Sequence, residues 1–599
     1  MARYDNIVRP STVRQVLEAE RVEDLRTLAR LVTRSVPTRK GELVDVVVAY
    51  LADPAHLREV LDGLDAIARS AVAEAAYGSG SLSPPAFRAK YGALPRRTGW
   101  LTALFDVTLF MPPDLGQRVR ALVPRPPDVI LEGVEELPAG DDMVMRLGEI
   151  AAQADLLAVL RLCDTGRLTV SQATRRPSQA TVRAVAEVLE EGDFYPDEAI
   201  AAFAWPLLLQ AGGLAALAAG RLALSANGRK ALAAAPHDTL ASLWRRWLKG
   251  GLIDEFSRVE AIKGQQAAGG RNLTAPAPRR AALAAALAEA PPGRWVQVDA
   301  FFRYMRACGH DFTVARDLWR LYITDPQYGS LGYDGGPGWS LMEGRFALCL
   351  LFEYAAVLGL IDVAYERPEG ARDDYRDRWG TDELDALSRY DGLRYFRLNA
   401  LGAYALGLSE AYAGPAGAPS QAGALRVLPN LEVVFLGARV AAHDALCIER
   451  YGEPRSAGVW ALSKAKLLQA LERDGNLADL EALLARTEGP LPDTVRSLLG
   501  EVRERSARLR DLGTYRLIEC ADADLARLLA HDRRLRGRAT LVGERHLAVP
   551  LSEETAFRRA LHTAGYALSA GAGAAQPAPA RSAAPAPDAR APSPGPRRR

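Results

Sequence analysis

Residues 425–435 form an apolar run that is rich in β-branched side chains and is broken once, by Pro429-Asn430. This composition predicts a buried strand, a bend and a second strand. Further helical and strand patterns follow: helices at 463–473 and after 493, a strand at 515–520, a helix at 522–530, a strand pair around 538–549, and a closing helix that ends near 566. The alternation predicts a mixed domain of strands and helices over residues 424–568.

Four short motifs in this region carry a family resemblance through their order and spacing. They are Val427-Leu428-Pro429-Asn430-Leu431-Glu432-Val433-Val434, Gly489-Pro490-Leu491-Pro492, Leu517-Ile518-Glu519-Cys520 with Asp522, and Ala564-Gly565-Tyr566. In this order they resemble the domain that precedes the ATPase motor in XPB-type helicases, which bacterial helicase-associated proteins carry at the C-terminus. The direct match covers about a quarter of the chain. The resemblance implies an α/β domain and a role beside DNA repair, processing or defence machinery.

The sequence contains no pattern typical of a nucleotide-driven motor. Such a motor needs a GxxxxGK[ST] loop and an acidic strand end that holds magnesium. Neither Pro37–Gly41 nor Ala226–Lys230 has that spacing, and the seven histidines do not pair at metal-ligand spacing. Neither a GxSxG nor an HExxH motif occurs. We therefore expect no enzyme activity, catalytic residue, metal or cofactor, and any helicase activity would come from another chain.

Residues 1–62 predict a compact helical unit that resembles a SAP-type helix-extended-helix motif. Leucines at helical spacing are followed by a break at 37–41 and a second helix start. In a SAP-type fold, the N-terminus of the second helix and its basic flank meet a phosphate backbone. Arg39 and Lys40 are the predicted contacts. The alternative is a helical hairpin whose basic turn is only solvated.

Two winged-helix-like units are predicted at 63–140 and 141–262. In the second, a helix begins after Arg-Arg-Pro and carries polar and basic side chains in its first turns, which is typical of a DNA recognition helix. An ordinary capped surface helix is the alternative. The predicted DNA-binding residues here are Arg175, Arg176, Ser178, Thr181 and Arg183.

A strand-to-helix signature occurs twice, at 220–232 and at 394–406. Its form, a strand followed by Leu, Ser or Asn, Ala, x, Gly, x, x, Ala, Leu, is common at the C-terminal edge of winged-helix domains. It predicts a third unit at 279–410, which includes a long apolar helix from Phe346 to Leu360. The predicted fold is therefore predominantly α with small β-wings (α+β): tandem winged-helix units followed by the XPB N-terminal-like α/β domain.

The remaining composition places limits on compartment and partners. Residues 569–599 are mostly Ala, Pro, Gly and Arg, which cannot bury enough apolar surface to offset their ordering entropy, so we expect disorder there. The five cysteines form no CxxC pair, and the sequence begins with no signal-peptide pattern. No apolar run approaches the roughly 18 residues of a membrane span. We expect a cytoplasmic protein without a membrane partner.

These patterns favour a non-catalytic DNA-binding accessory protein that holds duplex or forked DNA by its backbone beside a separate helicase or nuclease chain. The alternative is a protein-interaction scaffold without nucleic-acid contact, because winged helices often become protein-binding surfaces and the formal net charge is only +2. A contiguous basic stripe through the predicted contact residues would favour DNA. Scattered arginines beside an exposed apolar patch would favour a scaffold.

Overall fold

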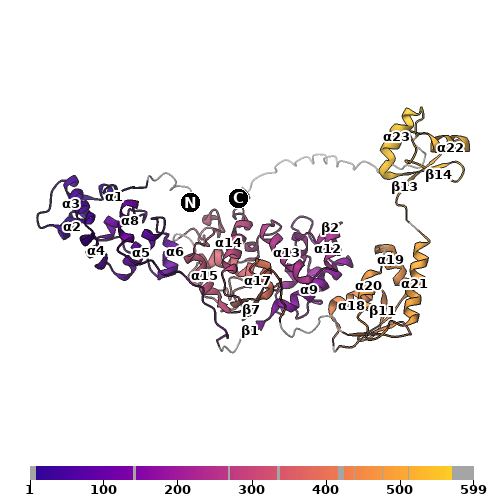
Figure 1. Cartoon of the computed structure of the whole chain (residues 1–599), viewed down its shortest axis with the longest axis horizontal. Helices are drawn as coiled ribbons and strands as arrows, with labels where there is room; N and C mark the ends of the chain where they lie inside the picture. Colours follow the sequence, from indigo (N-terminus) through magenta and orange to yellow (C-terminus); the bar gives the residue numbers. More distant parts are fainter. Residues whose placement is uncertain are drawn as a thin grey trace, which may run out of the picture. The chain divides into compact units, whose positions relative to one another are not determined.

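The computed structural model describes residues 9–138, 143–267, 270–333, 338–415, 424–437, 439–474, 477–509 and 511–569. The chain divides into two compact units, residues 1–499 and 500–599, each described by itself here. The division falls inside helix α21 (Asp493–Ala507) and inside the segment predicted as one domain, 424–568. Apart from Ser569, the tail predicted to be disordered lies outside the described residues. Figure 1 shows the helices and strands, coloured in their order along the sequence.

Helices dominate the structure, and the strands form small sheets. Helices account for 46% of the residues and strands for 13%, which confirms the predicted mixed α+β class. Among the described helices, none is both long enough and apolar enough to cross a bilayer.

The first helices of the larger unit surround one apolar core that draws side chains from residues 13–123. Leu25 and Leu28 are buried in it, as are Phe87 and Leu104, so the segments predicted as separate units at 1–62 and 63–140 contribute to the same core. The helices are α1 (Val13–Ala19), α2 (Val22–Val32), α3 (Lys40–Ala52), α4 (Pro54–Asp62), α5 (Ala66–Tyr77), α6 (Pro84–Tyr91), α7 (Leu101–Leu104) and α8 (Pro113–Arg120).

Residues 148–231 have the order helix, short strand, two helices, hairpin, helix. The short strand is formed at Thr169, which bridges to Arg221 in the second hairpin strand. The first helix, α9, is mostly buried, and so is α11, the helix directly before the hairpin. The elements are α9 (Gly148–Asp164), α10 (Gln179–Ala186), α11 (Ala201–Ala211), β2 (Ala215–Ala218), β3 (Arg221–Leu224) and α12 (Ala226–Ala231), followed by α13 (Pro236–Lys249) and the short elements η1 (Glu255–Arg258), β4 (Gln266–Ala267) and β5 (Gly270–Arg271).

The same order returns over residues 276–406. Here the short strand, β6, pairs with β8, and β7 and β8 form the hairpin; β1 (Val144–Arg146) joins them, so the sheet order is β1-β7-β8-β6. The elements are α14 (Pro276–Ala288), β6 (Trp295–Gln297), α15 (Val298–Ala307), η2 (Leu318–Arg320), a continuous helix made of η4 (Ser340–Gly344), α16 (Arg345–Cys349) and η5 (Leu350–Ala355), then β7 (Ile361–Tyr365), β8 (Leu393–Leu398) and α17 (Ala400–Leu406).

The signature found twice in the sequence has one structural cause in both places. Ser225 and Asn399 cap the helices α12 and α17, accepting hydrogen bonds from the N–H groups of Gly228 and Gly402. Each glycine lies against a backbone carbonyl that directly precedes its hairpin. A Cβ at Gly402 would be 2.0 Å from the Leu360 oxygen, and a Cβ at Gly228 would be 2.1 Å from the Leu214 oxygen. The signature is therefore a capped helix start pressed against a hairpin.

The predicted apolar helix at 346–360 is displaced in the structure. The helix begins at Ser340, six residues before the predicted start, and ends at Ala355; a turn at 356–359 then leads to strand β7 at 361–365. Gly359 makes the turn between them with a φ of 69°, a left-handed conformation that favours glycine, and a Cβ there would lie 2.6 Å from the Ala152 side chain. The predicted end at 360 thus lies directly before β7, but the apolar pattern did not reveal the turn or the helical residues before Phe346.

The two repeated segments bury their central helices against each other in one core that spans residues 131–405. The ring of Phe194 meets that of Phe352 edge-on, with 4.7 Å between centroids, and Trp247 stacks on Tyr354 at 4.1 Å. The Arg258 guanidinium lies 3.0 Å from a Glu353 carboxylate oxygen, and both side chains are buried. The helix 340–355 and α11 are therefore interior elements.

Asp155 is a buried carboxyl at the centre of α9, and it accepts a hydrogen bond of 2.7 Å from the Glu190 N–H. Burial raises the pKa of Asp155 to about 7, although that hydrogen bond and the nearby Arg146 oppose the shift. A folded-state pKa above the unfolded value means that stability is fullest below about pH 4 and falls as the pH rises towards 7. Asp155 should therefore weaken the fold at neutral pH.

Asp155→Asn should remove this pH dependence while keeping an oxygen for the Glu190 N–H. The free energy of unfolding of the variant, relative to that of the natural protein, should rise by about 2–3 kcal/mol between about pH 5 and about pH 8. Urea unfolding at both pH values, followed by tryptophan fluorescence, measures the difference. If the free energies of unfolding of the two proteins differed by the same amount at both pH values, the destabilising role given to Asp155 would be wrong.

Residues 425–507 form a four-stranded sheet, in the order β11-β12-β10-β9, with four helices. The predicted strand, bend and strand are confirmed as β9 and β10, and Leu431 takes a φ of 71° at the bend. The predicted helix at 463–473 is also confirmed, as α19. The elements are β9 (Leu425–Val427), β10 (Glu432–Phe435), α18 (Ala442–Glu449), β11 (Gly452–Ser456), β12 (Val459–Leu462), α19 (Lys464–Asp474), α20 (Ala478–Leu484) and α21.

The smaller unit contains a three-stranded sheet in the order β13-β15-β14, with a core of its own. Its predicted strands and helices are all confirmed. Leu547 and Val549 of the central strand are buried on one face, where Ala526 and Phe557 of the helices lie. The elements are β13 (Tyr515–Glu519), α22 (Ala523–His531), β14 (Thr540–Val542), β15 (His546–Pro550), η6 (Leu551–Glu553) and α23 (Glu554–Thr563).

Candidate nucleic-acid interface

The predicted contacts Arg39 and Lys40 lie at the start of α3, and both are exposed. Arg39 is the N-cap residue, and its side chain is 84% exposed and only 3.8 Å from the Glu42 carboxylate. Glu42 occupies the first turn, where it adds negative charge beside the free N–H groups. This helix start is accessible to a phosphate, but its charge is partly offset.

The predicted recognition helix, α10, divides its residues between surface and interior. Ser178 caps the helix by accepting from the Thr181 N–H at 3.2 Å. Thr181 has no exposed surface, and its hydroxyl donates to the Thr169 carbonyl at 2.7 Å. These two side chains fasten α10 to the short strand at Thr169. In this structure Thr181 has no surface that could contact a DNA backbone.

The three predicted arginines around α10 have different surroundings. Arg175 is exposed, with a φ of 62°, and Arg183 is exposed on the helix. Arg176 is half-buried and donates from Nη2 to the Ser257 hydroxyl at 2.9 Å. Arg175 and Arg183 thus remain accessible. Within the described part of the chain, no recorded contact joins this group to Arg39 or Lys40.

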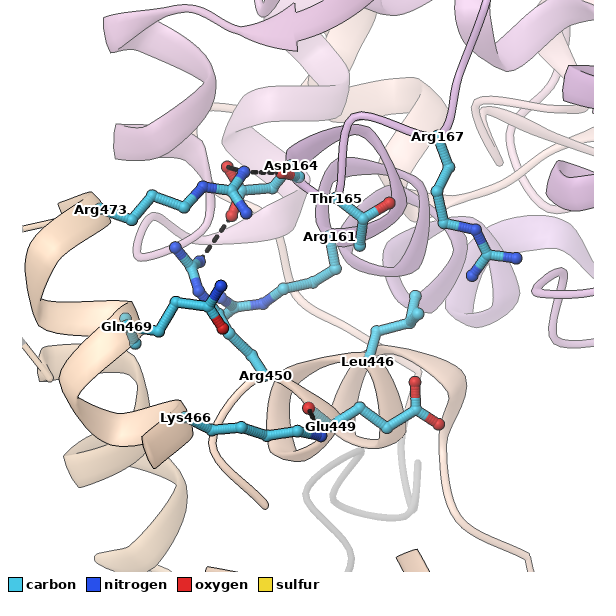
Figure 2. A pocket seen from close by; sticks show the side chains of 11 residues that line it. Arg161, Asp164, Thr165, Arg167, Leu446, Glu449, Arg450, Lys466, Gln469 and Arg473 are labelled. Atoms are coloured by element: carbon cyan, nitrogen blue, oxygen red, sulfur yellow. Dashed lines mark hydrogen bonds and ion pairs between the residues drawn. The ribbon is translucent and has the colours of Figure 1, made fainter. Parts of the chain in front are cut away.

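A second group of cations lines a cavity of about 310 Å³ inside the larger unit. Figure 2 shows that it is walled by the end of α9, by α18 and by α19. An adjoining hollow of about 460 Å³ shares part of this lining. We call the two together the basic cleft. Its charged lining residues are Arg161, Asp164, Arg167, Arg229, Glu449, Arg450, Lys466, Arg473 and Asp479.

Ion pairs fix the inner wall of the basic cleft. Arg450 Nη1 lies 2.6 Å from Asp164 Oδ2, and Arg473 donates to the Asp164 carbonyl, as the dashed lines of Figure 2 show. Arg161 pairs with Asp479. Lys466 donates to the carbonyl of Glu449 at the end of α18, at 2.9 Å, and to that of Gly452 at the start of β11, at 2.6 Å. Six cations face three carboxylates, so the cleft keeps a formal excess of three positive charges.

The outer lining has side chains that are accessible for binding. Arg167 and Gln469 are both exposed, and neither side chain has a recorded partner among the described residues. Arginine can bind a phosphate through two parallel hydrogen bonds, and glutamine adds a neutral donor. Positive charge held in place beside free donors fits an anion with several oxygens, such as a phosphate of a nucleic-acid backbone.

Sequence reasoning missed the basic cleft because its walls come from distant segments. The Arg450–Asp164 pair joins residues 286 positions apart in the chain. The helix at 463–473 was predicted, but nothing in its pattern indicates that Lys466 and Arg473 lie opposite the end of α9. Only the contact between α18 and α9 brings these cations together.

A further cavity of about 500 Å³ lies at the other end of α9 and has the opposite character. Glu149, Glu190, Glu191 and Asp362 line it together with Arg397 and apolar side chains. Burial raises the pKa of Glu149. Carboxylates in this number repel a phosphate, so the basic cleft is the better candidate for a nucleic-acid contact.

No family model matches this chain, and neither does any curated protein. Among the described residues, no group of three or more His, Cys, Asp or Glu side chains is arranged to hold a metal ion. The prediction that the chain is not an enzyme stays a prediction. Geometry and charge therefore carry the functional argument.

Proposed function

We propose that this chain is a non-catalytic DNA-binding accessory protein that holds the backbone of duplex or forked DNA in the basic cleft. The observation that supports it is the excess of three positive charges in the basic cleft, where Asp164 and Asp479 hold Arg450, Arg473 and Arg161 in place. Prearranged cations bind phosphates without paying to order the side chains at the moment of contact. Arg175 and Arg183, which are exposed around α10, are proposed as further backbone contacts.

The order of elements in 148–231 and 276–406 supports a winged-helix origin for both segments, because each has helix, strand, two helices and hairpin in that sequence. The helix before the hairpin is the one that reads the major groove in DNA-binding winged helices. Here those helices, α11 and 340–355, are buried in the shared core. The proposed binding therefore uses the phosphate backbone and not base edges.

The proposed XPB N-terminal-like identity of residues 424–568 rests on the four sequence motifs and on the strands and helices that contain them. A domain of this kind implies partnership with a motor. We include in the proposal that a separate helicase or nuclease chain acts on the DNA that this protein holds.

A protein-interaction scaffold is the second candidate, and one feature of the smaller unit favours it. Leu517 of β13 and Val542 of β14 are 61% and 46% exposed, and Tyr515 is also exposed. The pairing of both strands with β15 places Leu517 and Val542 on the sheet face opposite Leu547. An exposed apolar sheet face is typical of a protein contact.

Salt dependence and sequence independence test the proposed function. We expect full-length protein to bind a blunt duplex with an affinity that falls at least about tenfold between about 0.05 and 0.2 M salt. Two duplexes of unrelated sequence and equal length should bind within about threefold of each other, because no base contact is proposed. Fluorescence anisotropy at both salt concentrations measures this. Absence of salt-dependent binding would leave the scaffold as the better candidate.

A further inference from the structure

The four most exposed aromatic side chains among the described residues lie on two loops of one segment. Trp319, Tyr328 and Tyr333 belong to the loop between α15 and the helix 340–355, and Trp379 belongs to the loop between β7 and β8. Their exposed fractions are 60%, 63%, 47% and 64%. Large apolar side chains exposed together often mark an interaction site. We call these four rings the aromatic platform.

The loops that carry the aromatic platform are fixed to each other. The Thr324 hydroxyl of one loop donates to the Gly380 carbonyl of the other at 2.8 Å. The Ser330 hydroxyl donates to the Trp319 carbonyl at 2.9 Å. Gly332 lies directly beneath the Trp319 ring, where a Cβ would come within 2.4 Å of a ring atom. The rings are thus exposed but positioned.

A cavity of about 430 Å³ opens between these rings. Tyr328 and Trp379 line it with centroids 6.3 Å apart and planes tilted by 45°, and Tyr333 also contributes. Arg378 lines the same cavity, with Nε 3.5 Å from Asp377 Oδ1. No residue that the structure describes accepts a recorded hydrogen bond from the two Nη groups of Arg378. Ring faces and a guanidinium therefore share one opening.

We propose that the aromatic platform binds unpaired nucleotides of a single DNA strand, with bases stacked on Trp379 and Tyr328 and a phosphate held by Arg378. Exposed aromatic faces beside arginine bind single-stranded nucleic acid regardless of sequence, because every base has a flat π surface. The inference rests on the proposed function in one respect: it explains how a protein that holds a duplex distinguishes a fork.

The paired ring faces, and not the net charge, favour a nucleic acid over an acidic peptide, because flat bases can stack on both rings while Arg378 and Asp377 balance each other in the cavity lining. Arg316 and Arg376 are exposed on the same two loops, and neither has an ion-pair partner in the described part of the chain. Asp377 is the single carboxylate of the described residues that line the cavity, and Arg378 lies beside it. Asp382 and Glu383 follow on the same loop, but they do not line the cavity.

The test compares a labelled oligo(dT) of about 12 nucleotides, a fork with dT arms and a blunt duplex, using full-length protein. Tyr328→Ala with Trp379→Ala should weaken oligo(dT) binding at least about tenfold and abolish the preference for the fork, with blunt-duplex binding changed less than about twofold. Tyr328→Phe with Trp379→Phe keeps the rings and should bind oligo(dT) within about threefold of the natural protein. Circular dichroism checks the fold of each variant.

A second measurement needs no variant. Photocrosslinking of an oligonucleotide that contains 5-iododeoxyuridine should attach it to Tyr328 or Trp379, as located by mass spectrometry. Crosslinks confined to other residues, or oligo(dT) binding that survives loss of both rings, would overturn the inference and leave a protein partner as the better occupant. If the duplex binds and oligo(dT) does not, the inference fails and the proposed function stands. If oligo(dT) binds and the duplex does not, the proposed function fails and the inference about the aromatic platform stands.

Discussion

Replacing both Arg167 and Gln469 with glutamate is expected to lower the affinity for a blunt duplex by about 30-fold or more at about 0.1 M salt. The change turns the excess of positive charge in the basic cleft into near neutrality and places two carboxylates at its accessible rim. Both side chains are exposed, and neither makes a hydrogen bond or ion pair to another described residue, so we expect the fold to be unaffected. Anisotropy titrations over a salt series should also show a slope that is smaller by about one to two.

A matched control changes the same charge elsewhere on the larger unit. Arg58→Glu with Gln117→Glu alters two exposed side chains on α4 and α8 that have no recorded partner in the described ranges. We expect this variant to bind the duplex within about threefold of the natural protein, because long-range charge effects are screened within about 10 Å at this salt. An equal loss of affinity in both variants would show that overall charge, and not the basic cleft, governs binding.

The largest effect on stability is expected from Arg258→Met. Arg258 donates to both carboxylate oxygens of Glu353, at 3.2 and 3.0 Å, and Glu353 has no exposed surface. Tyr354 and Tyr390 also donate to that carboxylate, but their hydroxyls carry no charge to balance it. Leaving a buried carboxylate without its cation costs about 3–5 kcal/mol. Urea unfolding, followed by tryptophan fluorescence of the shared core, measures the loss.

The double variant Arg258→Met with Glu353→Gln distinguishes a charge effect from a packing effect. It removes both charges and keeps an amide oxygen that accepts from one of the two tyrosine hydroxyls, while the amide NH2 can donate to the other. We expect it to recover at least about half of the stability lost in the single variant. A double variant as unstable as Arg258→Met alone would show that the lost contacts of the arginine stem, and not the unpaired charge, cause the damage.

The parts of the fold that could be predicted are those whose patterns are local. The strands at 425–427 and 515–519 are short apolar-containing segments next to turn residues, and a repeated cap-and-glycine motif begins α12 and α17. The predicted helix at 346–360 overlaps the helix 340–355 and stops directly before β7, but its apolar pattern did not reveal the turn at 356–359. Tertiary packing decides such a boundary, and here it depends on a glycine turn.

The site was less accessible to sequence reasoning than the fold. Ser178 and Thr181 have the polarity of a recognition helix, but their hydroxyls satisfy the backbone and each other inside the protein. A polar side chain in the first turn of a helix can either cap the helix or contact a ligand, and the sequence does not separate these two roles. The basic cleft has no sequence signal at all, since Arg161 and Arg450 meet only through tertiary contact.

The mutual burial of α11 and the helix 340–355 limits how this protein can be cut into pieces. A recombinant fragment that stops between residues 263 and 275 would leave Trp205 and Phe352 on opposite products, each facing water. Such truncations should precipitate or be degraded, because they uncover large apolar faces.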